Sequence, residues 1–393
     1  MTNNDDEGRW APTEPQEDER DLDVGLLSRL RAAISATDWT VETLVSQLRK
    51  GNIYLDPEFQ RRDAWTIKRK SQYLESLILG LPTPQIILAE RKERRGTYIV
   101  IDGKQRLLSL RQFSASEDEI EFHRFDLKHL EVREDLNGFG FDKLTNPHSL
   151  FYSPDFENAT IRTVIIKSYS SEAYLYEVFL RINSGSVQLS PQELRQALHP
   201  GPFTSELNRF VVESKAIKQL LGLSRPDFRM RDNEILLRYL AFQFFHSEYR
   251  GNLKAFLDYA TETFNDDWTN FKPQIHQAFI DFERVVSTTF EIFGQDGAFR
   301  SWNGVKFEGR VNRAVIDVMA YYFTFPEIAQ QALQKREQIV TAFKELCEIE
   351  EDFRQAISGT TKSLWAVDAR FNLWAEALTR GAGISVNSPY FSG

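Results

Sequence analysis

Apolar positions follow different spacings in the two halves of the chain. Up to about residue 200, short runs of β-branched and apolar residues predict strands at 85–90, 97–102 and 161–167. Apolar residues three and four positions apart predict helices in the same half, at 24–36, 41–49, 66–79, 104–113 and 172–182. From residue 201 onward helical spacing predominates, at 204–221, 232–247, 252–265, 269–294, 308–323, 327–357 and 361–380. The pattern predicts an α+β domain over 23–200 followed by an all-helical domain over 201–393.

Helix boundaries carry the residues that commonly cap helices. Thr40 precedes an apolar helical pattern that Gly51 ends. Ser190 is followed by Pro191 and then by Glu193, which is the spacing of a capping box with proline at the first helical position. These signals predict helices that begin after Thr40 and after Ser190.

The stretch from Tyr98 to Leu110 joins a predicted strand to a predicted helix through a polar turn. Gly103 permits a backbone conformation that other residues resist, and the helix is predicted to start near Lys104. The first turn of a helix exposes backbone N–H groups with partial positive charge. Side-chain donors accompany them here, which predicts an anion-binding turn.

The side chains of this turn suggest more than one kind of chemistry. Arg106 can contact a phosphate through two donors, and Gln105 can reach a sugar, a base or an attacking water. Asp102 has the opposite charge and could coordinate a divalent ion, orient Arg106 or meet a ligand hydroxyl. Upstream, Gln60 and Arg61 offer the same donor types. The alternative is that these groups pair with one another in a polar core.

Charge is distributed unevenly around a net value of −9. Residues 1–23 carry nine acids and two arginines, so residues 1–22 are predicted to be a disordered acidic tail. Residues 61–111 carry twelve cations and five acids, a local excess of +7. This excess suits a phosphate-bearing ligand, and it is equally compatible with solvated helix and hairpin faces.

Several enzyme and protein classes are disfavoured by missing motifs. The chain has no phosphate-binding loop of the Gly-x-x-x-x-Gly-Lys-Ser/Thr type, no Gly-x-Ser-x-Gly elbow and no histidine motif of a metallonuclease. No nuclease motif is therefore found. The single cysteine, Cys347, rules out an intramolecular disulfide and favours a reducing compartment. With no apolar run of about 18–20 residues, we expect a cytoplasmic protein without a membrane segment.

A group of motifs in order and spacing resembles the N-terminal domain family of GmrSD-type restriction systems, which is similar to the ParB/sulfiredoxin-like superfamily. The resemblance covers roughly residues 38–200. It rests on Phe59-Gln60-Arg61 with Trp65, on Gly80-Leu81-Pro82-Thr83-Pro84, on Ile101-Asp102-Gly103-Lys104-Gln105-Arg106-Leu107, and on Phe179-Leu180-Arg181-Ile182-Asn183-Ser184-Gly185 followed by Leu189-Ser190-Pro191-Gln192-Glu193-Leu194. The family pattern is Asp-Gly-Gln-Gln-Arg, and this chain has Lys104 in place of the first glutamine.

The resemblance implies a nucleotide-binding domain that hydrolyses nucleoside triphosphates with Mg²⁺ in a bacterial defence system directed against DNA. It implies Asp102, Gln105 and Arg106 as catalytic residues, with Asp102 also holding the metal. The nucleotide-binding residues that it implies are Gln60, Arg61, Gly103, Lys104, Arg181 and Asn183. A separate nuclease effector subunit is the expected partner, and DNA is a further one. The alternatives are a non-enzymatic DNA-binding regulator and a nuclease acting on modified DNA.

Overall fold

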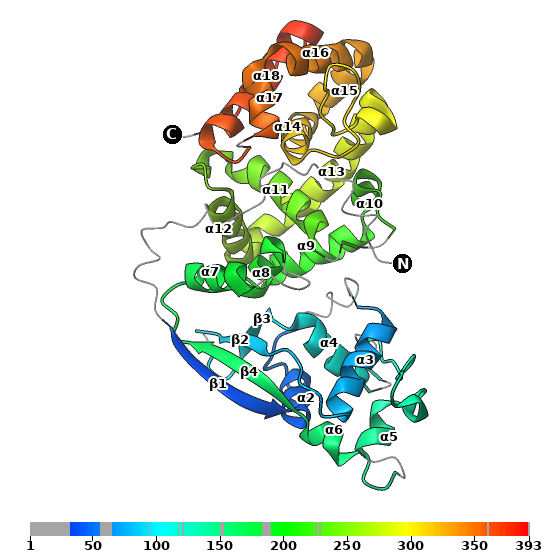
Figure 1. Ribbon diagram of the computed structural model, residues 1–393. Helices are drawn as coiled ribbons and strands as arrows, with labels where there is room; N and C mark the ends of the chain where they lie inside the picture. Colours follow the sequence, from blue (N-terminus) through cyan, green and yellow to red (C-terminus); the bar gives the residue numbers. More distant parts are fainter. Residues whose placement is uncertain are drawn as a thin grey trace. The chain divides into compact units, whose positions relative to one another are not determined.

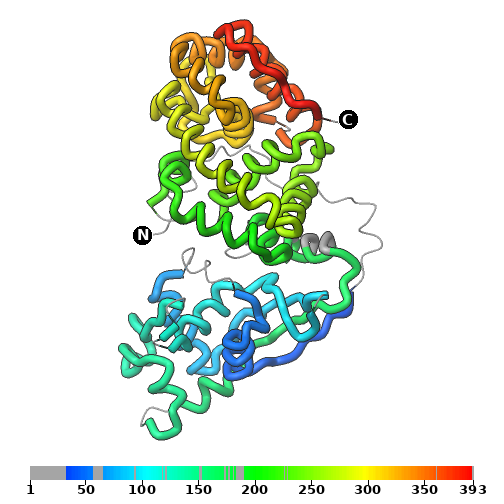
Figure 2. The backbone as a smooth tube through the Cα atoms, turned by 180° about the vertical axis from the view of Figure 1, so that it is seen from behind, coloured from blue at the N-terminus to red at the C-terminus, as the bar shows by residue number. Residues whose placement is uncertain are grey.

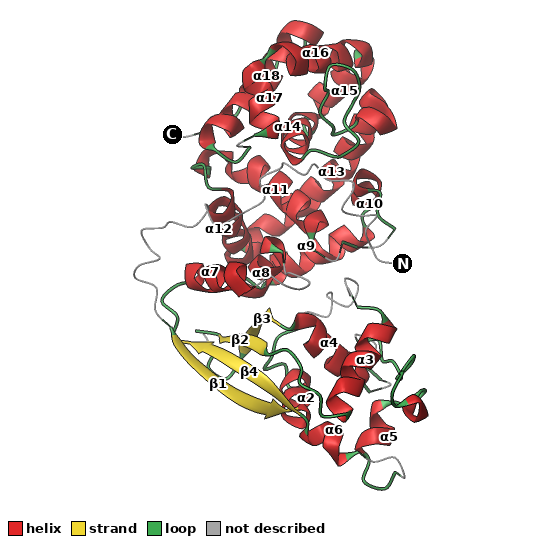
Figure 3. Cartoon of the chain, viewed as in Figure 1, coloured by secondary structure: helices red, strands yellow, loops and turns green. Residues whose placement is uncertain are grey.

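The computed structural model describes two units of the chain, one ending at Leu198 and the other beginning at His199. The first unit contains the strands, and the second is built from helices (Figure 3). The predicted acidic tail, 1–22, and most of the helix predicted at 24–36 lie outside the described residues. The described residues are 32–55, 65–92, 94–116, 118–119, 122–149, 153–182, 190–224, 226–227, 229–359 and 361–391.

In the described part of the first unit, four strands form one mixed sheet. They are β1 (Ala33–Thr40), β2 (Ile86–Glu90), β3 (Tyr98–Asp102) and β4 (Thr160–Lys167), in the spatial order β1-β4-β2-β3 (Figure 1). The β2–β4 pair is parallel, whereas β1–β4 and β2–β3 are antiparallel. Seen from behind in Figure 2, the blue β1 segment runs along the green β4 segment.

Helices cover both faces of this sheet. The elements of the unit are α2 (Val41–Arg49), α3 (Ile67–Ile78), α4 (Lys104–Phe113), η4 (Glu134–Leu136), α5 (Phe141–Thr145), α6 (Pro154–Asn158), α7 (Glu172–Ile182) and α8 (Pro191–Leu198). On one face Ile86, Leu88 and Val100 pack with apolar residues of α2, α3 and α4. On the other face Ile87 and Ile99 pack with residues of α7 and α8. The alternation of neighbouring strand residues between the two cores is the period expected of a buried strand.

The predicted α+β class is confirmed, as are the two predicted caps. The Thr43 N–H donates to Thr40 Oγ1 at 3.1 Å. At the other cap, the Ser190 N–H donates to Glu193 Oε2 at 2.7 Å and the Glu193 N–H donates back to Ser190 Oγ at 3.1 Å. The closer likeness to ParB and sulfiredoxin folds stays a prediction.

The last part of the helix predicted at 24–36 is wrong, because residues 33–36 belong to strand β1. Ala33 and Ile34 sit at helical spacing with the leucines before them, but the Ile34 side chain is 63% exposed and packs in no core. Pairing with β4 over eight positions satisfies the backbone there, which local apolar spacing does not reveal.

The second unit confirms the predicted helical half. Its elements are α9 (Pro202–Glu213), α10 (Lys215–Leu221), α11 (Arg231–Phe245), η5 (His246–Glu248), α12 (Leu253–Asp266), α13 (Trp268–Gly297), α14 (Arg313–Phe323), α15 (Pro326–Gln334), α16 (Arg336–Ile349), α17 (Glu351–Ser358) and α18 (Leu364–Ala382). The pattern at 308–323 becomes helical only at Arg313, because the Asn312 side chain caps that helix. The continuous pattern at 327–357 is divided into three helices.

Among the described residues no helix is both long and apolar enough to cross a membrane.

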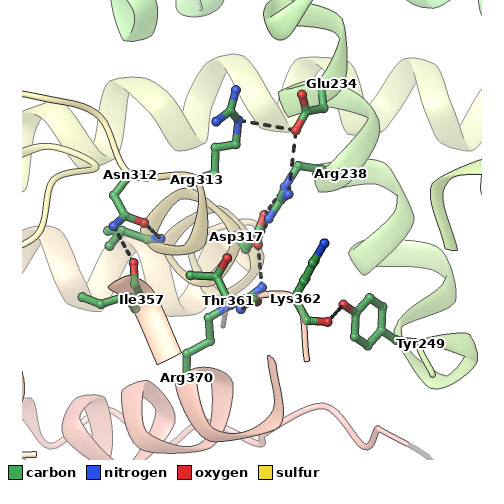
Figure 4. Close-up of polar contacts among 11 residues, drawn as sticks. Glu234, Arg238, Tyr249, Asn312, Arg313, Asp317, Ile357, Thr361, Lys362 and Arg370 are labelled. Carbon is green, nitrogen blue, oxygen red and sulfur yellow. Dashed lines mark hydrogen bonds and ion pairs between the residues drawn. The ribbon is translucent and has the colours of Figure 1, made fainter. Parts of the chain in front are cut away.

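A buried network of ion pairs joins α11, α14 and α18 (Figure 4). Asp317 accepts from Arg238 Nε at 3.0 Å and from Arg370 Nη2 at 2.8 Å. Glu234 lies 3.4 Å from Arg313 Nε and 3.8 Å from Arg238 Nη1. Asp317 is 3% exposed and Arg370 is 1% exposed, and burial lowers the pKa of the Arg370 guanidinium. One carboxylate therefore holds guanidinium groups from two other helices.

Replacing Asp317 with alanine should lower the free energy of unfolding of this unit by about 3–5 kcal/mol, because two buried guanidinium groups lose their anionic partner. Chemical denaturation followed by circular dichroism measures the loss. Asp296→Ala, at an exposed aspartate of α13, is the control and should change stability by less than about 0.5 kcal/mol. Equal losses in the two variants would contradict the role given to Asp317.

Candidate functional site

Strand β3 passes into helix α4 through the single residue Gly103. Its φ of +96° and ψ of 13° lie in the left-handed region, which favours glycine. A Cβ atom at this position would lie 3.0 Å from Ile86 Cγ1 and 3.2 Å from Arg106 Nη2. Both the backbone conformation and the close approach of Arg106 therefore require glycine here.

The Arg106 guanidinium folds back over this turn. Its Nη2 donates to Asp102 Oδ2 at 2.8 Å and to the Gln85 carbonyl oxygen at 2.9 Å. Its Nε is buried and donates to no residue that the structure describes. The Asp102 side chain is 22% exposed, and its Oδ1 takes part in no hydrogen bond with the described residues. The pair is thus anchored on one side and keeps one donor and one acceptor available.

Two more buried polar atoms around α4 lack a partner among the described residues. They are the Tyr73 hydroxyl, on α3, and Gln105 Oε1. Tyr73 is 7% exposed; burial raises the pKa of its hydroxyl, and the charge of Arg106 opposes that rise. Native proteins pair most buried polar groups, so unpaired ones indicate a place for water or a ligand.

Tyr73 is not among the site residues predicted from the sequence. The residue occupies an apolar stripe of α3 with Leu74 and Leu77, so its spacing indicates ordinary core packing. Its ring does pack as core, with the Trp65 ring 5.8 Å away in an edge-on arrangement. Only the missing partner of the hydroxyl distinguishes it, and no sequence signal reports that.

Lys104 is buried and paired, whereas its sequence context predicts a phosphate ligand. The ammonium is 7% exposed and donates to Glu193 Oε1, the carboxylate of the α8 capping box. This contact fixes the start of α4 to the start of α8. The positive charge of Lys104 remains close to the turn, but its ammonium group donates to Glu193.

The other predicted site residues are only partly described. Gln60, Arg61 and Asn183 lie outside the described residues. Arg181 is exposed in the last turn of α7. The structure thus brings together Asp102, Gly103, Gln105 and Arg106, with Lys104 beside them and facing Glu193, and it adds Tyr73.

Several of the cations predicted over 61–111 are engaged by other side chains inside the first unit. The buried cations Lys70 and Arg111 each have a partner: Lys70 Nζ donates to Gln112 Oε1 at 2.6 Å, and Arg111 forms two bonds with Glu119 at 2.7 and 2.9 Å. Arg111 also holds the pKa of the Glu119 carboxyl below its usual range. The stretch is therefore less available to a polyanion than its composition suggests.

Few of the described residues could bind a metal ion or act as a reactive thiol. No group of three or more His, Cys, Asp or Glu side chains there is arranged to hold a metal ion. Burial raises the pKa of the Cys347 thiol to about 12, so this cysteine is a packed core residue, as its helical context predicts. Asp102 remains the carboxylate that the turn offers to a divalent ion.

Replacing Lys104 with alanine should lower the free energy of unfolding by about 3–5 kcal/mol, because the Glu193 carboxylate would stay buried without its cation. Lys104→Gln should cost less, since an amide can still donate to Glu193. The matched control is Lys68→Ala, which breaks the exposed Lys68–Glu131 pair and should cost less than about 1 kcal/mol. Denaturant titration compares the three, and a similar cost at Lys68 and Lys104 would refute a buried pair.

Comparison with protein families supports the motifs independently. Residues 41–200 match the family described as GmrSD restriction endonuclease, N-terminal domain. Neither the curated proteins nor the solved structures contain a match to the chain. The matched range begins at the first residue of α2, ends just after α8 and includes the whole turn around Gly103. The match confirms the resemblance of residues 41–200 to the GmrSD N-terminal family that their motifs predicted.

Proposed function

We propose that this chain is the nucleotide-binding, NTP-hydrolysing component of a restriction-like defence system directed against DNA. The family match over 41–200 supports the restriction context. The main support for nucleotide binding is the state of Arg106. Its buried guanidinium is anchored by Asp102 and by the Gln85 carbonyl, and its Nε has no partner in the described residues.

Phosphate is the ligand group that suits this turn best. Arg106 has donors left after its anchoring contacts, and guanidinium donors match phosphate oxygens in pairs. The first backbone N–H groups of α4 add partial positive charge. Lys104 adds a nearby charge while its ammonium stays on Glu193.

A divalent ion would be held by Asp102. One carboxylate oxygen contacts Arg106 and the other accepts no hydrogen bond from the described residues, so the donor set offers one protein ligand. Mg²⁺ is commonly bound by one or two carboxylates, with phosphate oxygens and water completing the shell. When bound, the ion neutralises charge on the phosphates.

Gln105 is the residue proposed to position the attacking water. Its side-chain oxygen is buried and unpaired among the described residues, next in sequence to the Lys104 that departs from the family pattern. An amide oxygen can accept a hydrogen bond from water and so orient it toward a phosphorus atom. We propose Gln60, Arg61, Arg181 and Asn183 as further nucleotide contacts on the basis of the family motifs.

Non-enzymatic binding to DNA backbone is the second candidate, and one feature favours it. The turn between β2 and β3 carries Arg91, Lys92, Arg94 and Arg95, and the last three are exposed. Contacts of this kind weaken steeply with salt, whereas a nucleotide held at a partly buried turn is screened less. A separate nuclease subunit is the partner that we propose for either role.

Arg106→Ala should weaken Mg²⁺–triphosphate binding by about 1.5–3 kcal/mol, because a charge-assisted contact is lost. Arg106→Lys should recover only part of that loss, since an ammonium lacks the planar pair of donors. Isothermal titration measures both, with Arg95→Ala as an exposed control of equal charge change. Unaltered affinity in folded Arg106→Ala would reject the proposed site, and an equal loss at Arg95 would favour backbone binding.

Tyr73→Phe should weaken triphosphate binding about fivefold while leaving stability equal or raising it by up to about 1 kcal/mol, because the buried hydroxyl has no partner among the residues that the structure describes. Titration and thermal denaturation of the same samples measure the two effects. A loss of stability in Tyr73→Phe would show that the hydroxyl is paired inside the fold. The corresponding Tyr98→Phe change, on a half-buried tyrosine, is the control.

A further inference from the structure

The helical unit contains a pocket of about 470 Å³ between α11, α13 and the end of α14. This volume lies within the range of small-molecule sites, which is roughly 300–1,000 Å³. Its lining includes Tyr239, Gln243, Phe244, Gln274, Gln277 and Asp281. The pocket belongs to the second unit and shares no residue with the turn at Gly103.

Two aromatic side chains form the rigid part of the lining. The Phe244 ring is held edge-on by the Phe264 ring at 5.6 Å and by the Phe271 ring at 6.1 Å. Tyr239 is 3% exposed, and its hydroxyl pairs with Thr324 Oγ1 at 2.9 Å. These contacts hold both rings in place, and the partly exposed Phe244 ring offers a fixed surface on which a planar ligand packs.

Three glutamine amides supply the polar part of the lining. Gln243 Nε2 donates to the Tyr321 carbonyl oxygen at 3.1 Å, which orients its amide. The amides of Gln274 and Gln277 make only long contacts, 3.4 Å to the Asn270 carbonyl oxygen and 3.5 Å to Asp281. None of the three side-chain oxygens accepts a hydrogen bond from the described residues. An amide presents a donor and an acceptor side by side, the arrangement that pairs with the edge of a nucleobase.

The charges around the pocket disfavour an anionic ligand. No lysine or arginine is among the lining residues, and Asp281 contributes a carboxylate. The neighbouring Arg284 is engaged: its Nη2 contacts Asp281 at 3.1 Å and the Thr324 carbonyl oxygen at 2.6 Å. A phosphate inside would face a carboxylate without a free cation from the lining. The ligand should therefore be neutral, planar and rich in hydrogen-bonding edges.

We propose that this pocket binds a nucleobase, with any attached phosphate remaining outside it. The base could belong to a free nucleoside or to a nucleic-acid strand, because both present the same planar edge. The inference goes beyond nucleotide binding at the Gly103 turn and does not depend on it, since the two sites have no residue in common.

The test uses the full chain and saturation-transfer NMR titrations with adenosine, guanosine, cytidine and thymidine. At least one nucleoside should bind saturably, and Gln277→Ala should weaken it about tenfold, the discrimination expected of a paired amide contact. Gln277 is exposed, so the change should leave folding intact. Gln331→Ala removes an exposed amide on α15 and is the matched control. Arg106→Ala should not change nucleoside affinity.

The source of the base follows from a second titration with short single-stranded oligonucleotides. Tighter binding than the nucleoside, still weakened by Gln277→Ala, identifies a nucleic-acid strand as the source. Equal or weaker binding identifies the free nucleoside. Saturable binding by neither ligand would overturn the proposal, as would equal affinities in Gln277→Ala and Gln331→Ala. Unaltered triphosphate affinity in Arg106→Ala, together with saturable nucleoside binding, would reject the Gly103 site alone.

Discussion

The passage from β3 to α4 through one left-handed residue is the constraint on which the first unit depends. Because the helix starts directly after the strand, the first turn of α4 lies at the edge of the sheet. Its cationic side chains lie on both faces of the sheet. Arg106 lies beside Ile86, in the core shared with α3, while Lys104 reaches α8 in the opposite core. A substitution at Gly103 would disturb both layers through this one residue.

Local patterns predicted this turn because its determinants are neighbours in the sequence. A β-branched run, a glycine and an amphipathic stretch specify strand, turn and helix within a few residues, and the Asp102–Arg106 pair spans a single helical turn. The partner of Lys104 is Glu193, which lies 89 residues further along the chain. The residues around Lys104 do not indicate this pair, and for that reason they predicted a phosphate contact. The helix predicted over 33–36 was wrong for the same reason, since the pairing of strand β1 with β4 depends on distant residues.

In both units, buried cations of the described residues are met by carboxylates from other elements, as Lys104 is by Glu193 and Arg370 by Asp317. In the helical unit, Arg238 and Arg313 belong to the network around Asp317 and Glu234. Such pairs lose much of their attraction to desolvation, whereas removing one partner leaves a buried charge without its counterion. Arg238 and Arg313 are therefore each held by a carboxylate of a neighbouring helix.

The position of β1 affects how the first unit can form during synthesis. Asp38 and Arg162 face each other across β1 and β4, yet they are 124 residues apart in the chain. A nascent β1 therefore has no sheet to join until β4 has left the ribosome, and closing so long a loop slows folding. Until then β2 lacks its parallel neighbour β4, so this period is when the chain is most exposed to aggregation or to chaperones.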